Sequence, residues 1–180
     1  GNFATVLDGV VSGSGGIIKA GTGVFQLNGT ANDFTGDVTI NEGMLQLRGQ
    51  GSMGNATKKL IINGGKLSTV GAQSLTLANP IEVGGDFGLS SGSGTLTLNG
   101  TMDLGGATRT LTAEGNGNKS IAGDISNGGL VVNQSGGTLT FSGNNTYTGT
   151  TTLSNGTLLV NGAHTGGGLY TVASGATLGG

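Results

Sequence analysis

The sequence predicts an all-β protein built as a parallel β-helix, a solenoid of about eight coils with roughly 20–25 residues each. Apolar and polar residues alternate in short runs, a pattern that suits strands and is too short for helices. Turn-forming Gly, Asn and Ser residues separate these runs. The pattern of residues 21–49 also returns in residues 135–162, which indicates a repeat protein.

The two copies of the repeat align with the same side-chain alternation. Phe25 and Leu27 align with Leu139 and Phe141, Phe34-Thr35-Gly36 with Tyr147-Thr148-Gly149, and Leu45 and Leu47 with Leu158 and Val160. A one-residue slip would turn every side chain to the other face, so shared alternation indicates a shared buried face. We therefore expect the eight aliphatic and phenyl side chains of these aligned strands to point inward. The side chains expected to point outward are Gln26, Gln46, Thr138, Thr140, Thr157 and Leu159.

Strands are predicted along the whole chain, and corners are predicted between them. An Asn-Gly pair usually marks a hairpin. Here related segments recur after about 20–25 residues, as in solenoid coils, and no run has the charged outer face of an antiparallel meander. The predicted strands are, in order, Ala4–Leu7, Val10–Val11, Ile17–Ile18, Val24–Leu27, Val38–Ile40, Met44–Leu47, Leu60–Ile62, Lys66–Val70, Leu75–Leu77, Ile81–Val83, Phe87–Leu89, Thr95–Leu98, Met102–Leu104, Thr108–Thr112, Ser120–Ile125, Leu130–Val132, Thr138–Phe141, Thr151–Leu153, Thr157–Val160, Leu169–Val172 and Ala176–Leu178.

Composition narrows the class of protein. Glycine makes up 41 of the 180 residues, and only 9% of residues are charged, so the chain lacks the high charge of disordered sequences. Seven Lys and Arg residues with a net charge of −2 argue against nucleic-acid binding. No cysteine is available for a disulfide or a thiolate metal site, and no run of 18 apolar residues predicts a transmembrane helix. We expect residues 1–180 to form a single β-helix segment of a longer chain, with uncapped ends at Gly1–Val11 and Ala173–Gly180.

Residues 136–162, GGTLTFSGNNTYTGTTTLSNGTLLVNG, resemble the passenger-associated transport repeat of bacterial autotransporters. Residues 21–49 match this repeat more loosely, and residues 60–85 also read like passenger-domain coils. The resemblance implies a right-handed parallel β-helix that is secreted or anchored at the cell surface through the outer membrane. It also implies a partner, a C-terminal outer-membrane β-barrel of the same parent chain, which we expect downstream of this segment. The repeat carries no catalytic residue.

For each residue that could act in catalysis or bind a ligand, the sequence favours a structural role. His164 stands in NGAHTGGG without a nucleophile elbow, so we expect a solvated loop residue. Asp33, Asp37 and Glu42 are the one local group of acids, and their aligned partners in the second copy are uncharged, which favours surface charge over a calcium or sugar site. Gly49–Gly54 matches a dinucleotide-binding pattern that is common by chance in so glycine-rich a chain. We expect the Phe34 and Tyr147 rings to cover the edge of the core at a loop.

The sequence therefore predicts a non-enzymatic structural stem that supports export and presents an adhesive region, with no cofactor and no metal. A host or neighbouring cell surface is the other partner we consider. Two alternatives are a carbohydrate-active β-helix enzyme, which needs a cleft lined with acids, and a surface- or ice-binding solenoid, which needs regular threonine rows. The structural residues of the repeat are Phe34, Gly36, Leu45, Leu47, Leu139, Phe141, Tyr147, Gly149, Leu158 and Val160.

Overall fold

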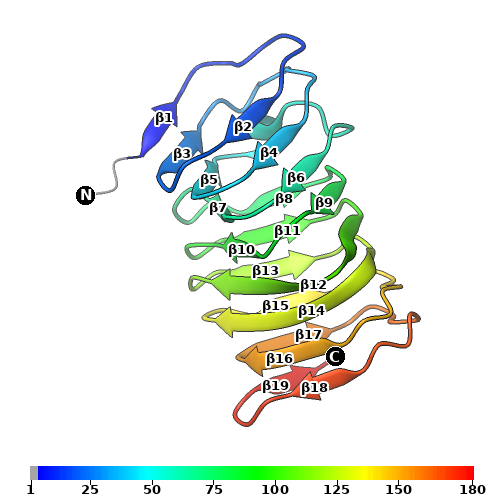
Figure 1. Cartoon of the computed structure of the whole chain (residues 1–180). Helices are drawn as coiled ribbons and strands as arrows, with labels where there is room; N and C mark the ends of the chain where they lie inside the picture. The colour runs from blue at the N-terminus through cyan, green and yellow to red at the C-terminus, as the bar shows by residue number, and fades with distance from the viewer. Residues whose placement is uncertain (1–3) are drawn as a thin grey trace.

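The computed structural model describes residues 4–180, which fold as a parallel β-solenoid of about eight turns. Figure 1 shows the coils stacked in chain order from the N-terminus to the C-terminus. Every strand pairing in the described part of the chain is parallel, and each joins a strand to its equivalent one coil away. The prediction of corners in place of hairpins is therefore confirmed. The right-handed winding of the β-helix, which the resemblance implies, stays a prediction.

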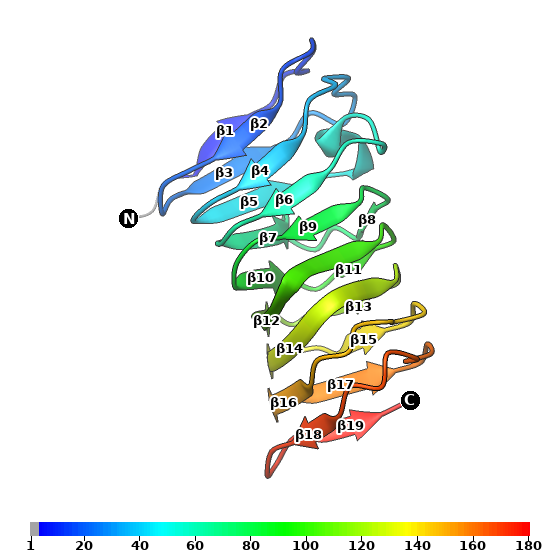
Figure 2. The ribbon, with the colours of Figure 1, turned by 45° about the vertical axis from the view of Figure 1, so that its right-hand side comes forward.

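The strands form three faces, which Figure 2 shows from a second direction. Face 1 holds β1 (Thr5–Leu7), β3 (Val24–Leu27), β5 (Met44–Leu47), β7 (Lys66–Thr69), β10 (Phe87–Ser90), the second parts of β12 (Met102–Glu114) and β14 (Ile125–Ser135), β16 (Thr151–Asn155) and β18 (Tyr170–Val172). Face 2 holds β2 (Ile17–Lys19), β4 (Val38–Ile40), β6 (Leu60–Ile62), β9 (Ile81–Val83) and the first residues of β12 and β14. Face 3 holds β8 (Leu75–Leu77), β11 (Thr95–Leu98), β13 (Asn118–Ile121), β15 (Leu139–Phe141), β17 (Thr157–Val160) and β19 (Thr177–Gly179).

One hydrophobic core runs through the stack, because equivalent side chains of successive coils lie above one another. Of the eight aligned residues expected to point inward, six are fully buried, namely Leu27, Leu45, Leu47, Leu139, Phe141 and Leu158. Phe25 and Val160 are partly buried and pack against the same core. Their neighbours Gln26, Gln46, Thr138, Thr140, Thr157 and Leu159 are all more accessible than the buried set. Alternate residues thus share one continuous interior, and no coil has a core of its own.

The two repeat copies occupy different faces of the solenoid. In the first copy β4 lies on face 2 and β5 on face 1, and a loop over residues 28–37 stands in place of face 3. In the second copy β16 lies on face 1 and β17 on face 3, and a loop over residues 143–150 stands in place of face 2. The same sequence pattern therefore appears one face further round the solenoid. Among the described residues, the coils with strands on all three faces are those from β6 to β15.

The structure differs from the predicted strands in four places. The run Ser120–Ile125 is divided, because β13 ends at Ile121 and β14 begins at Ile125, with a corner over residues 122–124. Val10–Val11 forms no strand, because this segment stacks against the loop of residues 28–37, where Val11 N–H donates to Asn32. The runs 102–104 and 108–112 join into the single strand β12, because Gly105 and Gly106 adopt φ of 68° and 75° and turn the strand from face 2 to face 1. A short 3-10 helix, η1 (Gln50–Met53), also forms. Over residues 4–180, no helix has the length and apolarity needed to cross a bilayer.

Candidate functional site

The aromatic residue of each repeat fills the core where a strand is missing. Phe34 is 1% exposed and Tyr147 is fully buried, and each belongs to the loop that replaces a face in its copy. Asn32 and Asn145, two residues earlier, are also buried, and each side-chain oxygen accepts a hydrogen bond from the preceding coil, from Val11 N and Ile125 N. The loop thus closes the core with one ring and binds the coil below with one amide.

The glycine two residues after each ring lies against the backbone of the preceding coil. A Cβ atom on Gly36 would lie 2.3 Å from Gly16 N, and one on Gly149 would lie 2.5 Å from Gly128 O. Gly36 N–H donates to Gly15 O, and Gly149 N–H donates to Gly128 O, at 3.1 and 2.8 Å. The aromatic-x-Gly pattern therefore has a packing reason in both copies, and it needs no ligand.

His164 stacks on the second repeat's tyrosine. Its ring centroid lies 4.3 Å from that of Tyr147 and 5.3 Å from that of Tyr170, and its Nε2 lies 2.9 Å from Tyr147 O. The Tyr147 hydroxyl lies 2.6 Å from Thr151 Oγ1, and burial raises the pKa of this hydroxyl well above its ordinary value. The expectation of a solvated histidine is wrong, because aromatic stacking holds the ring half-buried. No carboxylate contacts this group among the described residues, so it lacks the acid of a hydrolytic triad.

Most acidic side chains bind the adjacent coil. Asp37 accepts from Lys59 N at 2.8 Å, and Asp86 and Asp124 accept from Thr110 N and Asn144 N, each at 2.7 Å. The remaining acids with a side-chain partner are Asp8 with Asn28, Asp103 with Gly105 N and Asn127, Glu82 with Lys59, and Glu114 with Lys66. Residues 4–180 hold no group of three potential metal ligands among His, Asp and Glu. These acids therefore join parts of the solenoid to one another.

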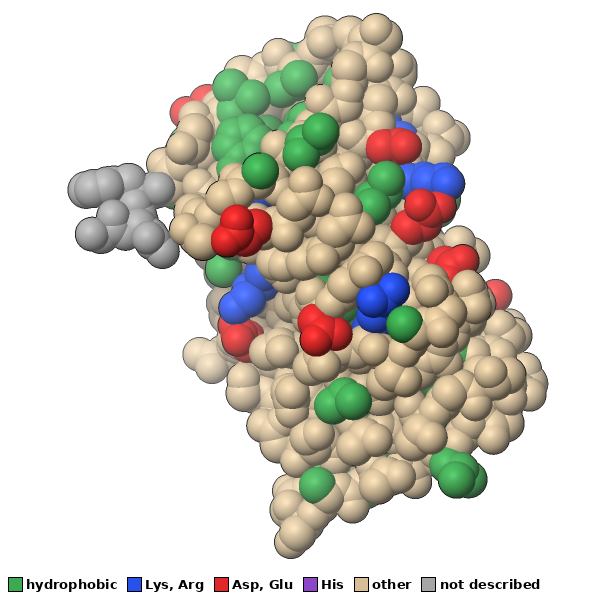
Figure 3. All heavy atoms as spheres, in the orientation of Figure 1, with side chains coloured by type: hydrophobic (Ala, Val, Ile, Leu, Met, Phe, Trp, Pro, Cys, Tyr) green, Lys and Arg blue, Asp and Glu red, His purple; other side chains and the backbone are tan. Residues whose placement is uncertain are grey.

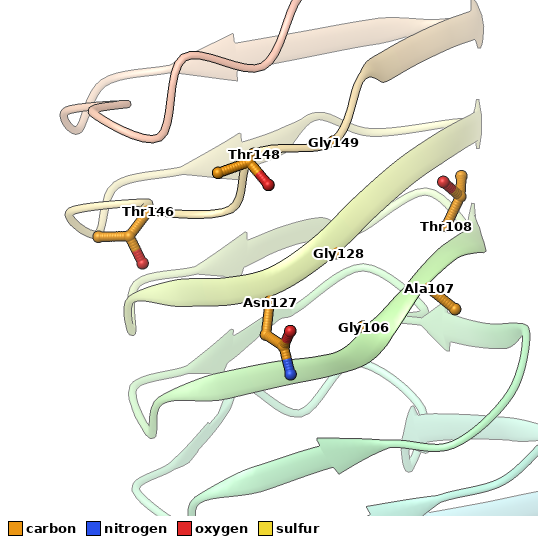
Figure 4. Close-up of a pocket in the computed structure, with 8 residues that line it drawn as sticks. All are labelled: Gly106, Ala107, Thr108, Asn127, Gly128, Thr146, Thr148 and Gly149. Carbon is orange, nitrogen blue, oxygen red and sulfur yellow. The ribbon is translucent and has the colours of Figure 1, made fainter.

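A shallow hollow of about 370 Å³ lies on the outside of the solenoid, where β12 and β14 turn from face 2 to face 1 (Figure 4). Thr108, Asn127, Thr146 and Thr148 line it together with glycines and Ala107 from three successive coils. Asn127 has φ of 60°, the one positive φ outside glycine in residues 4–180, and its amide donates to Asp103 at 3.0 Å. The lining offers hydroxyl and amide groups and no titratable side chain, so this hollow can contact a polar surface but has no acid or base for catalysis.

Sequence reasoning missed both the hollow and several polar residues inside the core. Lys19, Lys119 and Gln134 occupy inward positions of their strands and are at most 5% exposed. The signal for them is the register between coils, since each stands where the adjacent coil has an aliphatic residue or alanine.

Comparisons with known proteins agree with this architecture. The passenger-associated-transport-repeat family matches residues 17–47 and 131–160, which overlap the two copies described above. The chain is also similar to the adhesin BmaC autotransporter of Brucella suis biovar 1 (strain 1330), with 37% identity over 137 residues. The chain is a β-solenoid that carries two passenger-associated transport repeats and is homologous to an autotransporter adhesin. The match covers 76% of this chain and 4% of the length of the adhesin, and no solved structure matches it. Passengers of autotransporter adhesins belong to the secreted or cell-surface proteins.

Proposed function

We propose that this β-helix is a structural stem of an autotransporter passenger, which carries an adhesive region of the parent protein away from the outer membrane. The observation that carries this proposal is the single core shared by all coils. A shared core makes a rod in which each coil is stabilised by its neighbours. The number of coils, and so the length of the rod, can therefore vary without a change in its cross-section.

The same geometry supports folding during export. Each strand pairs with the equivalent strand about 20 residues earlier, as Leu158 does with Leu139 and Thr140 with Ser120. A coil that emerges from a pore therefore finds its partner surface already formed on the previous coil. In this proposal the pore belongs to an outer-membrane β-barrel at the C-terminal end of the parent chain, and the folded passenger stays exposed at the surface or is released.

The stem is not an enzyme in this proposal. The acids whose side chains have partners bind backbone, asparagine or lysine groups of the solenoid itself, as Asp37 and Asp124 do, and the outer hollow lacks titratable groups. The ice-binding alternative has little support, since the outward column of face 3 runs Thr76, Thr97, Ser120, Thr140 and Leu159 and is thus irregular.

The test removes one whole coil from the parent protein in its own bacterium. Deletion of residues 60–80 joins Lys59 to Ile81 and leaves Val38 able to pair with Ile81, because Leu60 pairs with both. We expect surface display, measured by antibody binding to intact cells, to stay within twofold of wild type. Deletion of residues 60–69 is the control, because it removes two faces of a coil and leaves the third without register; it should reduce display at least tenfold.

The activity of the displayed protein decides between a stem and a functional site. His164→Ala and Asp37→Ala should leave any adhesive or enzymatic activity of the parent unchanged. A tenfold loss of activity in either variant, with display intact, would contradict the stem proposal and place the activity in this segment.

A further inference from the structure

Lys119 occupies a leucine position inside the solenoid. It lies in the inward column of face 3, between Leu96 and Leu139 of the adjacent coils. The column continues with Leu75 below and Leu158 above. Lys119 is nevertheless fully buried. A lysine in such a column keeps its methylene groups in the apolar core, and its ammonium group needs hydrogen-bond acceptors within the protein.

Four backbone carbonyls surround the Lys119 ammonium. Its Nζ lies 2.7 Å from Glu114 O, 2.9 Å from Gly115 O, 2.8 Å from Gly117 O and 2.9 Å from Gly136 O. The first three belong to the turn between β12 and β13, and the fourth belongs to the next coil. Gly115 and Gly136 have φ of 80° and 81°, a conformation that suits glycine. We call these four oxygens the carbonyl cage.

Two other buried polar side chains also donate hydrogen bonds to the carbonyls of a turn. Lys19 takes the position of Ile40 in the inward column of face 2, and its ammonium donates to Ala20 O, Gly21 O and Glu42 O. Gln134 follows Ala113 on face 1, and its amide donates to Gly136 O and Gly137 O. Turn carbonyls on two corners of the solenoid thus point inward and receive a donor from a residue in a core column.

The chemistry of the carbonyl cage suits a monovalent cation. All four oxygens are neutral backbone carbonyls, whereas divalent ions such as Ca²⁺ usually take carboxylates as well. The nearby Glu114 carboxylate pairs with Lys66 and provides only its backbone oxygen here. An ammonium group has three N–H donors for these four oxygens, so one N–H is shared between two of the oxygens.

We propose that the turn Glu114–Gly117, completed by Gly136 of the next coil, is a binding site for a monovalent cation, and that the Lys119 ammonium is its resident cation. Without this side chain, the site takes ammonium, methylammonium or potassium from solution. Because one oxygen comes from the following coil, the occupied site also holds two successive coils together. This inference does not depend on the function of the parent protein.

The first experiment measures the thermal unfolding of the Lys119→Ala chain in a series of chloride salts at equal ionic strength. We expect ammonium, methylammonium and potassium to raise the melting temperature by several degrees in a saturable manner, because they bind only the folded chain. Tetramethylammonium, which has no N–H donor and is too large, should give no such rise. Equal melting temperatures in all salts would overturn the proposal.

Two controls isolate the cage. The wild-type chain carries its own cation and should not distinguish the salts. Lys119→Leu matches the column of Leu96 and Leu139 and fills the volume with an aliphatic side chain, so it should be equally insensitive. The same salt response in Lys119→Leu as in Lys119→Ala would also overturn the proposal.

A second measurement needs no variant that must fold. In the wild-type chain labelled with ¹⁵N at lysine, the Lys119 ammonium protons should exchange slowly with water and give a persistent NH₃⁺ correlation at neutral pH. Lys59, whose side chain is 50% exposed, is the internal reference and should exchange too fast to be seen. Exchange at Lys119 as fast as at Lys59 would contradict the cage.

Discussion

Two buried lysines of this protein differ in what surrounds their ammonium groups. Burial lowers the pKa of both Lys58 and Lys119, against the attraction of nearby carboxylates. Lys119 has four carbonyl partners. Lys58 Nζ has no hydrogen-bond partner and lies 4.0 Å from the centroid of the Phe34 ring. A cation–π contact replaces only part of the lost hydration, so the Lys58 ammonium lacks the hydrogen-bond acceptors that Lys119 has, and its burial opposes folding.

We predict that Lys58→Met raises the free energy of unfolding at pH 7 by about 1 kcal/mol, because an apolar side chain of similar length replaces a buried charge without acceptors. The folded-state pKa of Lys58 lies below the ordinary value of 10.5, so the unfolded chain binds more protons between the two values. Wild-type stability therefore rises with pH across this window, and the advantage of Lys58→Met should shrink as pH approaches 10.5. Urea unfolding at a series of pH values measures both effects.

Lys59→Met provides the matched control for this prediction. Lys59 is adjacent in sequence but exposed, and its hydrogen bond and attraction to Glu82 raise its pKa. Its replacement should bring no gain in stability at pH 7. A Lys58→Met chain less stable than wild type at pH 7 would show that the contact with Phe34 outweighs the cost of burial.

At the scale of single residues, the alternation of the sequence predicts the core well where the inward residues are apolar. The inward positions of Leu139, Phe141 and Leu158 follow from the pattern alone, and all three are fully buried. The pattern could not place Lys119, because its burial depends on carbonyls that the turn after β12 and the next coil bring together. Those oxygens belong to the backbone and leave no mark on the sequence.

The element that distinguishes the two repeats is the loop that replaces a strand. In the second copy the Tyr147 hydroxyl lies 2.6 Å from Thr151 Oγ1, and both side chains are buried. The aligned pair in the first copy is Phe34 and Val38, both buried and apolar. Each copy thus has a matched pair of side chains at the point where the loop joins the next strand. The pair is hydrogen-bonded in the second copy and apolar in the first.

We predict that Tyr147→Phe destabilises the chain by about 1 kcal/mol, because it leaves the Thr151 hydroxyl buried without its partner. The double variant Tyr147→Phe/Thr151→Val converts this pair into that of the first copy and should recover most of the loss. Urea unfolding of wild type, both single variants and the double variant forms a complete double-mutant cycle.

The first copy supplies the reciprocal control for this cycle. Phe34→Tyr adds a hydroxyl opposite Val38 and should destabilise the chain by about 1–3 kcal/mol, since the new group is buried without an acceptor. A cycle in which the effects of Tyr147→Phe and Thr151→Val simply add would show that the pair is not coupled.

At the scale of elements, the sequence predicts most strands but not the face on which each one lies. The alternation in Val38–Ile40 and Thr151–Leu153 is alike, yet β4 lies on face 2 and β16 on face 1. The face depends on how many strands each earlier coil contains and on where its corners fall. The Gly105-Gly106 pair is an example. In the sequence it predicts a break between two strands, whereas in the structure it forms a bend within the single strand β12.

The molecule as a whole has one core and two exposed end coils. In the described residues, β1 pairs only with β3, and β19 pairs only with β17. Large apolar side chains are exposed near both ends, with Ile18 71% and Leu169 74% exposed, and the others are Val6, Leu7, Val10, Val172 and Leu178. Figure 3 shows apolar atoms gathered on the coils close to the N-terminus. Open strand edges beside apolar surface favour association with a further strand or coil.

We predict that the isolated 180-residue chain opens first at its two ends and associates end to end as its concentration rises. Hydrogen exchange on the dilute chain should show low opening free energies for β1, β2, β18 and β19, while residues 40–140 exchange only through global unfolding. Light scattering across a concentration series should show a growing mass.

Ile18→Lys and Leu169→Lys place charges on the two ends and should reduce this growth without changing exchange in the central coils, since both side chains are exposed. A chain that stays monomeric at all concentrations, with end strands exchanging as slowly as β12, would show that the end coils are stable without neighbours and would contradict a stem whose coils depend on stacking.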